Sequence, residues 1–249
     1  MKSFRLLGGV ALLAVLLVAL LASTPARLLQ RVLPGQQVVL SGVQGTLWDG
    51  SASRAIVQLA PGYLHLGAVR WTLSPLSLLT LSPRLELQST WGAQRVTGNV
   101  VLRGQRDLDL RDVEAQLDAD LLRKFAPLAV DGLFSAELQQ LSLRDGLPHS
   151  AQGRVVWQQA GFQSPRGRVP LGSYALDFTQ APGEALQGEI LTLSGPMLAE
   201  GRARLEGRAY SINVLLRSEG TMDAALKEAL QLMAMPEGDG YRLKLAAEF

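Results

Sequence analysis

The chain has 249 residues, with 24 basic side chains, 22 acidic side chains, two His and no Cys. The lack of Cys excludes disulfides, thiolate nucleophiles and zinc ribbons, and two His are too few for most histidine-based metal clusters. Lys2 and Arg5 carry the only charges of the first 26 residues, so the remaining 223 residues hold 22 basic and 22 acidic side chains. A neutral body argues against nucleic-acid binding, which usually needs a basic surface.

The N-terminal segment is strongly apolar. Residues 6–22 contain no charged or strongly polar side chain, and as a helix they would span about 26 Å, near the lower limit for crossing a bilayer. A cleaved signal peptide needs a shorter apolar stretch and small residues just before the cut, and Leu20 and Leu21 interrupt the small residues here. We therefore expect a signal anchor, with cleavage as the open alternative.

The charges beside this segment predict its orientation. Lys2 and Arg5 keep the N-terminus in the cytoplasm by the positive-inside rule. Residues 1–26 are thus predicted to form a cytoplasmic tip and a transmembrane anchor. No second apolar stretch of that length follows, so we expect residues 27–249 to form one domain on the far side of the membrane, which in a bacterium is the periplasm.

The body shows the period of two that is typical of β-strands. In the last stretch Tyr241, Leu243 and Leu245 alternate with Arg242 and Lys244, as in a strand with one wet face. The same pattern, punctuated by Gly and Pro, predicts strands at 37–44, 52–59, 64–73, 84–90, 94–103, 108–118, 132–144, 150–159, 169–179, 185–194, 200–207, 209–217 and 241–249. The apolar phase flips at 207–209, which predicts a bulge or a turn there.

Helices are minor. Thr221 is the predicted N-cap of a helix at 222–235, which Pro236 ends. Short helical turns are expected at 75–81 and 120–126.

The predicted fold is therefore mainly β: an N-terminal transmembrane helix, then a long antiparallel meander with a few short helices. A meander with one apolar face has to cover that face. A twisted sheet folded into a trough and a closed sandwich both satisfy this constraint, and the sequence does not choose between them.

No constellation of residues predicts catalysis or a cofactor. The acidic residues of 107–120 could bind a cation, but they lack EF-hand spacing, and Arg106 and Arg111 offer simple charge pairing on a solvated face. His65 and His149 are isolated. Asp49, which precedes a Gly, is typical of a turn. We expect no metal, no cofactor and no enzyme activity.

The four Trp are better placed for a function. Trp48, Trp71, Trp91 and Trp157 fall in or beside predicted strands. Core packing is one interpretation, and contact with a partner or with lipid is the other.

Two segments resemble a known family. Residues 45–50 read Gly-Thr-Leu-Trp-Asp-Gly, and residues 70–75 read Arg-Trp-Thr-Leu-Ser-Pro. Together with the predicted anchor and β-rich body, they look like the type II secretion system protein N family, the general secretion pathway protein N of Gram-negative bacteria. The signature residues carried over are Gly45, Leu47, Trp48, Gly50, Trp71 and Pro75.

The resemblance implies a non-catalytic inner-membrane accessory of the machine that exports folded proteins across the outer membrane. Its expected partners are other inner-membrane or periplasmic components of that machine. The signature residues would act as structural elements or partner contacts. A weaker similarity to AsmA-like proteins implies an alternative, a periplasmic trough that binds or transfers phospholipid.

Overall fold

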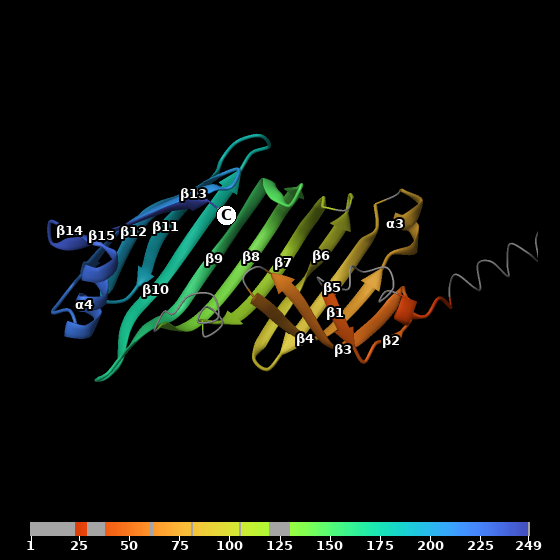
Figure 1. Ribbon diagram of the computed structural model, residues 1–249, viewed down its shortest axis with the longest axis horizontal. Coiled ribbons are helices and arrows are strands. Elements are labelled where there is room, and N and C mark those ends of the chain that lie inside the picture. Colours follow the sequence, from red (N-terminus) through yellow and green to blue (C-terminus); the bar gives the residue numbers. More distant parts are fainter. Residues whose placement is uncertain are drawn as a thin grey trace, which may run out of the picture. The chain divides into compact units, whose positions relative to one another are not determined.

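The computed structural model of the protein describes residues 23–28, 38–59, 62–80, 82–104, 106–119 and 130–248. The chain divides into two compact units, Met1–Trp91 and Gly92–Phe249, and each is built mainly from antiparallel strands (Figure 1). The predicted mainly β class is confirmed. Residues 1–22 of the predicted anchor range 1–26 and the predicted turn at 120–126 lie outside the described residues. Of the last four residues of that range, Pro25 forms a β-bridge with Thr46 and Ala26 begins a short 3-10 helix. Within the described ranges, no helix is both long and apolar enough to cross a membrane.

The first unit contains a small antiparallel sheet in the order β1, β3, β4, β5, with β2 paired to the start of β3. Its elements are η1 (Ala26–Leu28), β1 (Val38–Ser41), β2 (Gln44–Gly45), β3 (Asp49–Leu59), β4 (Gly62–Leu73), α3 (Pro75–Leu79) and β5 (Arg84–Trp91). A small apolar core lies over β3 and β4, where Ala26, Val43 and Ala52 pack around the indole of Trp71.

The second unit contains a longer meander in the order β6 to β13, then β15, then β14. Its elements are β6 (Gln94–Leu102), β7 (Leu108–Asp118), β8 (Val130–Arg144), β9 (Leu147–Ser164), β10 (Gly167–Gln180), β11 (Leu186–Ser194), β12 (Met197–Glu206), β13 (Ala209–Ser218), α4 (Ala224–Met233), β14 (Met235–Glu237) and β15 (Gly240–Glu248). In Figure 1 these strands lie side by side from green to blue, and α4 lies at the end of the unit that holds β14 and β15.

Each predicted strand is present, with two differences in detail and one open alternative resolved. Strand β9 runs five residues beyond its predicted end at residue 159, because Gln159 takes a positive φ of 50° in a bulge that breaks the alternation. The phase flip at 207–209 is a turn: Glu206 pairs with Ala209 across a two-residue loop. Strand β14 has no sequence signal, because it has only three residues and includes a Pro.

The sheet of the second unit is open. Its strands pair with neighbours along the path from β6 to β14, and that path does not close on itself. Among the described residues no large side chain is fully buried, and the smallest exposed fractions belong to alanines such as Ala119 and Ala160. Of the two predicted architectures, the described strands of this unit do not form the closed sandwich.

One face of this sheet is apolar. Cross-strand pairing aligns Leu117, Phe134, Trp157 and Tyr174 in a row across β7 to β10. The rings of Phe134 and Trp157 stack with centroids 5.4 Å apart, and Trp157 lies 5.9 Å from Tyr174. Such aromatic pairs stabilise a sheet beyond their buried area.

Helix α4 covers part of the apolar face. Leu226 is buried against a cluster that includes Tyr174, Met197 and Val214. The Tyr174 hydroxyl donates to the Met197 carbonyl at 2.8 Å, and burial raises the pKa of Tyr174 to about 12. The rest of the face is half-buried, so the unit has a one-sided core instead of a dry interior.

The opposite face carries charge. Register places Glu137, Arg154, Asp177, Glu189 and Arg202 in one transverse row across β8 to β12. Arg154 forms a two-pronged ion pair with Asp177, at 2.5 Å and 2.7 Å. The balanced charges of the sequence thus form the wet face of the sheet.

The cap of α4 differs from the prediction. The helix starts at Ala224, and Asp223 is its N-cap, with the carboxylate accepting from the backbone N–H groups of Ala225 and Leu226 at 2.9 Å and 3.2 Å. Thr221, the predicted cap, lies two residues too early to reach these donors. An Asp is favourable at this position because its negative charge lies at the positive end of the helix dipole.

We expect the Asp223→Ala variant to lower the free energy of unfolding by about 1 kcal/mol, because two backbone donors of α4 lose their acceptor. Thr221→Ala is the matched control and should leave the free energy unchanged. Urea unfolding followed by circular dichroism measures both. Equal effects of the two substitutions would contradict the assignment of Asp223 as the cap.

Candidate functional site

Five of the six signature residues come together in the first unit, and Pro75 lies near them in the sequence. Gly50 of β3 pairs with Trp71 of β4 on one side and with Gly45 of β2 on the other. Leu47 and Trp48 form the turn between β2 and β3, and Pro75 opens α3 directly after β4. We call this set, with Gly45, Leu47, Trp48, Gly50, Trp71 and Pro75 as its members, the signature cluster.

The indole of Trp71 holds the turn in place. Its ring is only 4% exposed, and its Nε1 donates to the Leu47 carbonyl at 3.2 Å. The backbone N–H of Leu73 donates to the Trp48 carbonyl at 2.7 Å, so the turn is fastened to β4 at two points. Core packing, one of the two interpretations of the tryptophans, is therefore the one that applies to Trp71. Its buried indole N–H needs an acceptor and has one in the Leu47 carbonyl.

The two glycines of the cluster lie where a side chain would collide with neighbouring atoms. A Cβ on Gly50 would collide with Cζ2 of Trp71 and would lie 2.7 Å from the Thr46 carbonyl. Gly45 has a positive φ of 82°, and its Cβ would lie 2.5 Å from the Asp49 carbonyl. Glycine is the residue that tolerates both conditions.

Local hydrogen bonds shape the turn itself. The Thr46 N–H donates to the Asp49 carbonyl at 2.8 Å, and the Asp49 N–H donates to the Thr46 hydroxyl at 3.1 Å. Asp49 therefore belongs to a turn, as the sequence predicts, and it acts through its backbone groups.

The same turn holds the last residues of the predicted anchor range 1–26, just beyond its apolar stretch. The Leu47 N–H donates to the Thr24 carbonyl at 2.8 Å, and Pro25 forms a β-bridge with Thr46. Ala26 is 1% exposed against the Trp71 cluster. We call these contacts between residues 24–26 and the turn at 46–47 the clasp. Because backbone atoms make its hydrogen bonds, no sequence motif could have predicted it.

Pro75 marks the exit of the chain from β4. Ser77, which is 5% exposed, donates to the Ser74 carbonyl at 2.5 Å and accepts from the Arg84 N–H at 2.9 Å. These bonds tie α3 to the start of β5. Sequence reasoning missed Ser77, because a single Ser in a Leu-rich stretch carries no distinctive pattern.

The other tryptophans have different surroundings. Trp157 donates its indole N–H to the Asp131 carbonyl at 3.1 Å and stacks in the aromatic row. Trp91 is 41% exposed, and its ring lies 5.7 Å from His65. Trp157 is therefore a packing residue of the second unit, and His65 is a neighbour of an aromatic ring.

The acidic residues of 107–120 belong to β7 and to the segments on either side of it. Among the described residues no group of three or more His, Cys, Asp or Glu is placed to hold a metal, and Asp120 lies outside them. Asp107 accepts from the Asp145 N–H at 2.9 Å and so supports the turn between β8 and β9.

The predicted pairing of these carboxylates with Arg106 and Arg111 is wrong for Asp109. Asp109 is 4% exposed and lies 2.9 Å from both Arg103 and Arg144. Burial raises the pKa of Asp109, but hydrogen bonds from Arg103, Arg144 and Ser142 outweigh it and leave the pKa below its usual value. The sequence-near arginines are excluded because the strand register brings β6 and β8 to Asp109.

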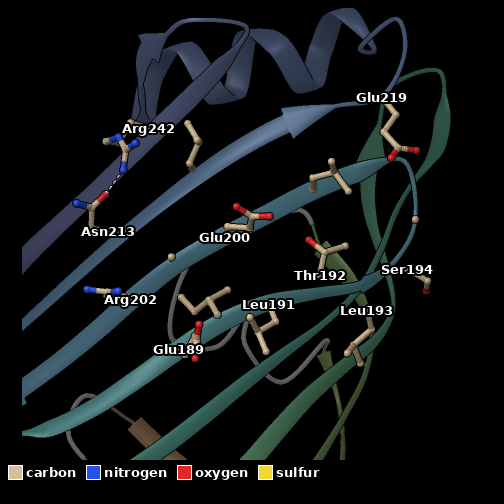
Figure 2. Close-up of a pocket in the computed structure, with 15 residues that line it drawn as sticks. Glu189, Leu191, Thr192, Leu193, Ser194, Glu200, Arg202, Asn213, Glu219 and Arg242 are labelled. Carbon is tan, nitrogen blue, oxygen red and sulfur yellow. Dashed lines mark hydrogen bonds between the residues drawn. The ribbon is translucent and has the colours of Figure 1, made fainter.

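A hollow lies on the charged face of the second unit. Its volume is about 950 Å³, and it is lined by residues of β11, β12, β13 and β15. Figure 2 shows Glu219 and Ser194 at one end, and Asn213 with Arg242, joined by a 2.9 Å hydrogen bond, at the other. Glu189, Glu200 and Arg202 have no ion-pair partner in the described part of the chain.

Apolar side chains share this hollow. Leu191, Leu198 and Leu215 line it together with Leu193, which is 53% exposed. Exposed leucines beside unpaired charges are typical of a surface that another protein covers. The hollow is thus the second candidate site, and sequence alternation alone did not separate it from the rest of the wet face.

The open sheets and the clasp define a β-rich scaffold whose signature residues hold backbone in place. The family model for type II secretion system (T2SS), protein N, matches residues 36–244, and the chain belongs to this family. It is 31% identical over 230 residues to the type II secretion system protein N of Aeromonas hydrophila, which covers 89% of each chain. It is 26% identical over 247 residues to that of Vibrio cholerae, which covers 93% of each chain.

A third relative, the type II secretion system protein N of Klebsiella pneumoniae, is 28% identical over 229 residues, with 89% of this chain and 87% of the relative covered. No solved structure gave a significant match.

We expect Gly50→Ala to lower the free energy of unfolding by about 1–3 kcal/mol, because the new methyl group overpacks the Trp71 ring. Gly220→Ala is the matched control, since its Cβ would meet open space. Thermal unfolding of both variants measures the difference. A Gly50→Ala protein as stable as the control would contradict this expectation. It would mean that the Trp71 ring can shift without any loss of unfolding free energy.

We expect Asp109→Asn to lower the free energy of unfolding by about 1–3 kcal/mol at neutral pH, because charge-assisted hydrogen bonds are lost. A carboxylate with a lowered pKa contributes stability above its unfolded pKa and loses it as the pH falls through the folded pKa. The difference from the parent should therefore vanish in strongly acidic buffer. Urea titrations at both pH values measure it.

The control for this experiment is Asp112→Asn. Asp112 is exposed on the same strand, and it takes a positive φ of 49° that Asn tolerates. Its substitution should change the stability little at either pH. A pH-independent loss in Asp109→Asn would contradict the role assigned to the charge.

Proposed function

We propose that this chain is a non-catalytic accessory component of the type II secretion machinery. In this proposal residues 1–26 anchor it in the inner membrane, and the periplasmic body of residues 27–249 supports the export of folded proteins across the outer membrane through protein contacts. Membership of the protein N family supports a role in that secretion system.

The clasp is the observation that carries the proposal. The turn at 46–47 binds residues 24–26, which are the last residues of the predicted anchor range 1–26 and lie just beyond its apolar stretch 6–22. Such a contact would keep the first sheet close to the membrane instead of leaving it on a loose tether. The signature cluster would then act by fixing the position of the body, and the partner contact would lie elsewhere.

The hollow of the second unit is the surface that we assign to a secretion component. It combines half-exposed leucines with the unpaired charges of Glu189, Glu200 and Arg202. Interfaces of the non-obligate kind combine apolar and charged side chains in this way. The unpaired charges would select the partner and its orientation.

We expect the full chain, crosslinked in intact cells and purified from membranes, to carry other type II secretion components with it. Leu193→Arg should lower their recovery by about five-fold or more, because it replaces the most exposed leucine of the hollow with a charged side chain. It should reduce the secretion of exoproteins in the same cells. Quantitative mass spectrometry and an exoprotein assay measure the two effects.

The matched control is Leu232→Arg, which replaces a leucine of α4 that is 83% exposed and lies outside the hollow. It should leave recovery and secretion unchanged. Recovery of phospholipid without any secretion component would instead favour the lipid-binding trough. Normal secretion after deletion of the chain would overturn the proposed function.

A further inference from the structure

The outer edge of β15 lacks a partner strand over most of its length. Strand β15 pairs with β13 from Tyr241 to Glu248, but on its other side β14 reaches only as far as Arg242. No strand in the described part of the chain lies along the outer side of residues 243–248. Residues 244–248 are exposed. A free edge of this length is a template for another strand.

The hairpin between β14 and β15 determines which backbone groups point outward. Glu237 pairs with Gly240 across a two-residue loop, and such a loop is closed by a hydrogen-bonded pair. Alternation along the ladder then directs the N–H and C=O groups of Lys244, Ala246 and Glu248 toward the free side. The odd-numbered residues between them face β13.

The neighbouring edge is protected, whereas this one is not. Pro236 of β14 pairs with Tyr241 in the position whose N–H would point outward, and Pro has no N–H to donate. Residues 243–248 contain no Pro. The sheet therefore blocks extension along β14 and permits it along β15.

The side chains of this edge are self-complementary. Lys244, Ala246 and Glu248 lie on the charged face, so a Lys and a Glu flank a small residue at equal distances along the strand. On the other face Leu243 and Leu245 continue the apolar rows of Val214 and Ile212. Leu245 is 44% exposed at the margin of that face.

We propose that a second copy of this chain occupies the edge, with the two β15 strands antiparallel about a two-fold axis at Ala246. In this register Lys244 of each copy faces Glu248 of the other, and the outward backbone groups of residues 244, 246 and 248 all pair. Opposite charges directly across an antiparallel ladder are favourable. The two apolar faces join into one continuous surface.

Other registers between the two β15 strands are less favourable than the one centred on Ala246. Moving the axis toward Lys244 brings the second strand against β14, which already pairs with Arg242. Moving the axis toward Glu248 shortens the ladder and brings the two Glu248 carboxylates together, which is unfavourable. The charges and the reach of β14 therefore select the axis at Ala246.

The chain has no Cys, so a single introduced thiol reports on this interface. In the full chain, Ala246→Cys should give a disulfide-linked dimer under mild oxidation, because hydrogen-bonded antiparallel partners have Cα atoms about 5.5 Å apart, within disulfide range. Non-reducing electrophoresis measures it. Ser211→Cys is the matched control, since Ser211 pairs with Ala246 one strand inward and is also exposed; it should remain monomeric.

Charge exchange tests the register. In the Ala246→Cys background, Lys244→Glu or Glu248→Lys should each lower the yield of dimer about five-fold, because like charges then face each other twice. The variant carrying both exchanges should recover it. Equal crosslinking of Ser211→Cys, an unchanged yield in the single-charge variants, or a disulfide from Ala246→Cys to a different protein would each overturn the proposal.

Discussion

The alternation of side chains along antiparallel strands is the constraint on which the second unit depends. It places Phe134, Trp157 and Tyr174 on one face, and Arg154 and Asp177 on the other. Because the sheet does not close, helix α4 shields only part of the apolar face. Stability must then come from the continuous ladder of strand pairs, cross-strand rings and ion pairs, and not from a filled interior.

The first unit relies on a different interaction, the hydrogen bond from the buried indole of Trp71 to the Leu47 carbonyl. That bond positions a turn whose backbone holds residues 24–26 and whose glycines leave room for the ring. Gly45, Leu47, Gly50 and Trp71 are therefore neighbours in space, and their contacts hold the turn in a single backbone conformation.

Most of the strands were predictable because their side chains alternate with a simple period of two. The alternation of Tyr241, Leu243 and Leu245 is found unchanged in β15, and Gly207 lies in the turn that the change of phase predicts. Prediction failed where strand register, a bulge or the exact position of a cap decided the outcome. Asp109 pairs with Arg103 and Arg144 instead of its sequence neighbours, Gln159 carries β9 through a bulge, and Asp223 replaces Thr221 as the cap of α4.

The sequence by itself determined the mainly β class, the spacing of the strands and the absence of disulfides, since each follows from local composition and period. Only the tertiary structure decided that the sheet of the second unit stays open, that the signature turn clasps residues 24–26, and that residues 243–248 form an unpaired edge. Those features depend on strand register and backbone hydrogen bonds, which join residues far apart in the chain and leave no mark in side-chain identity.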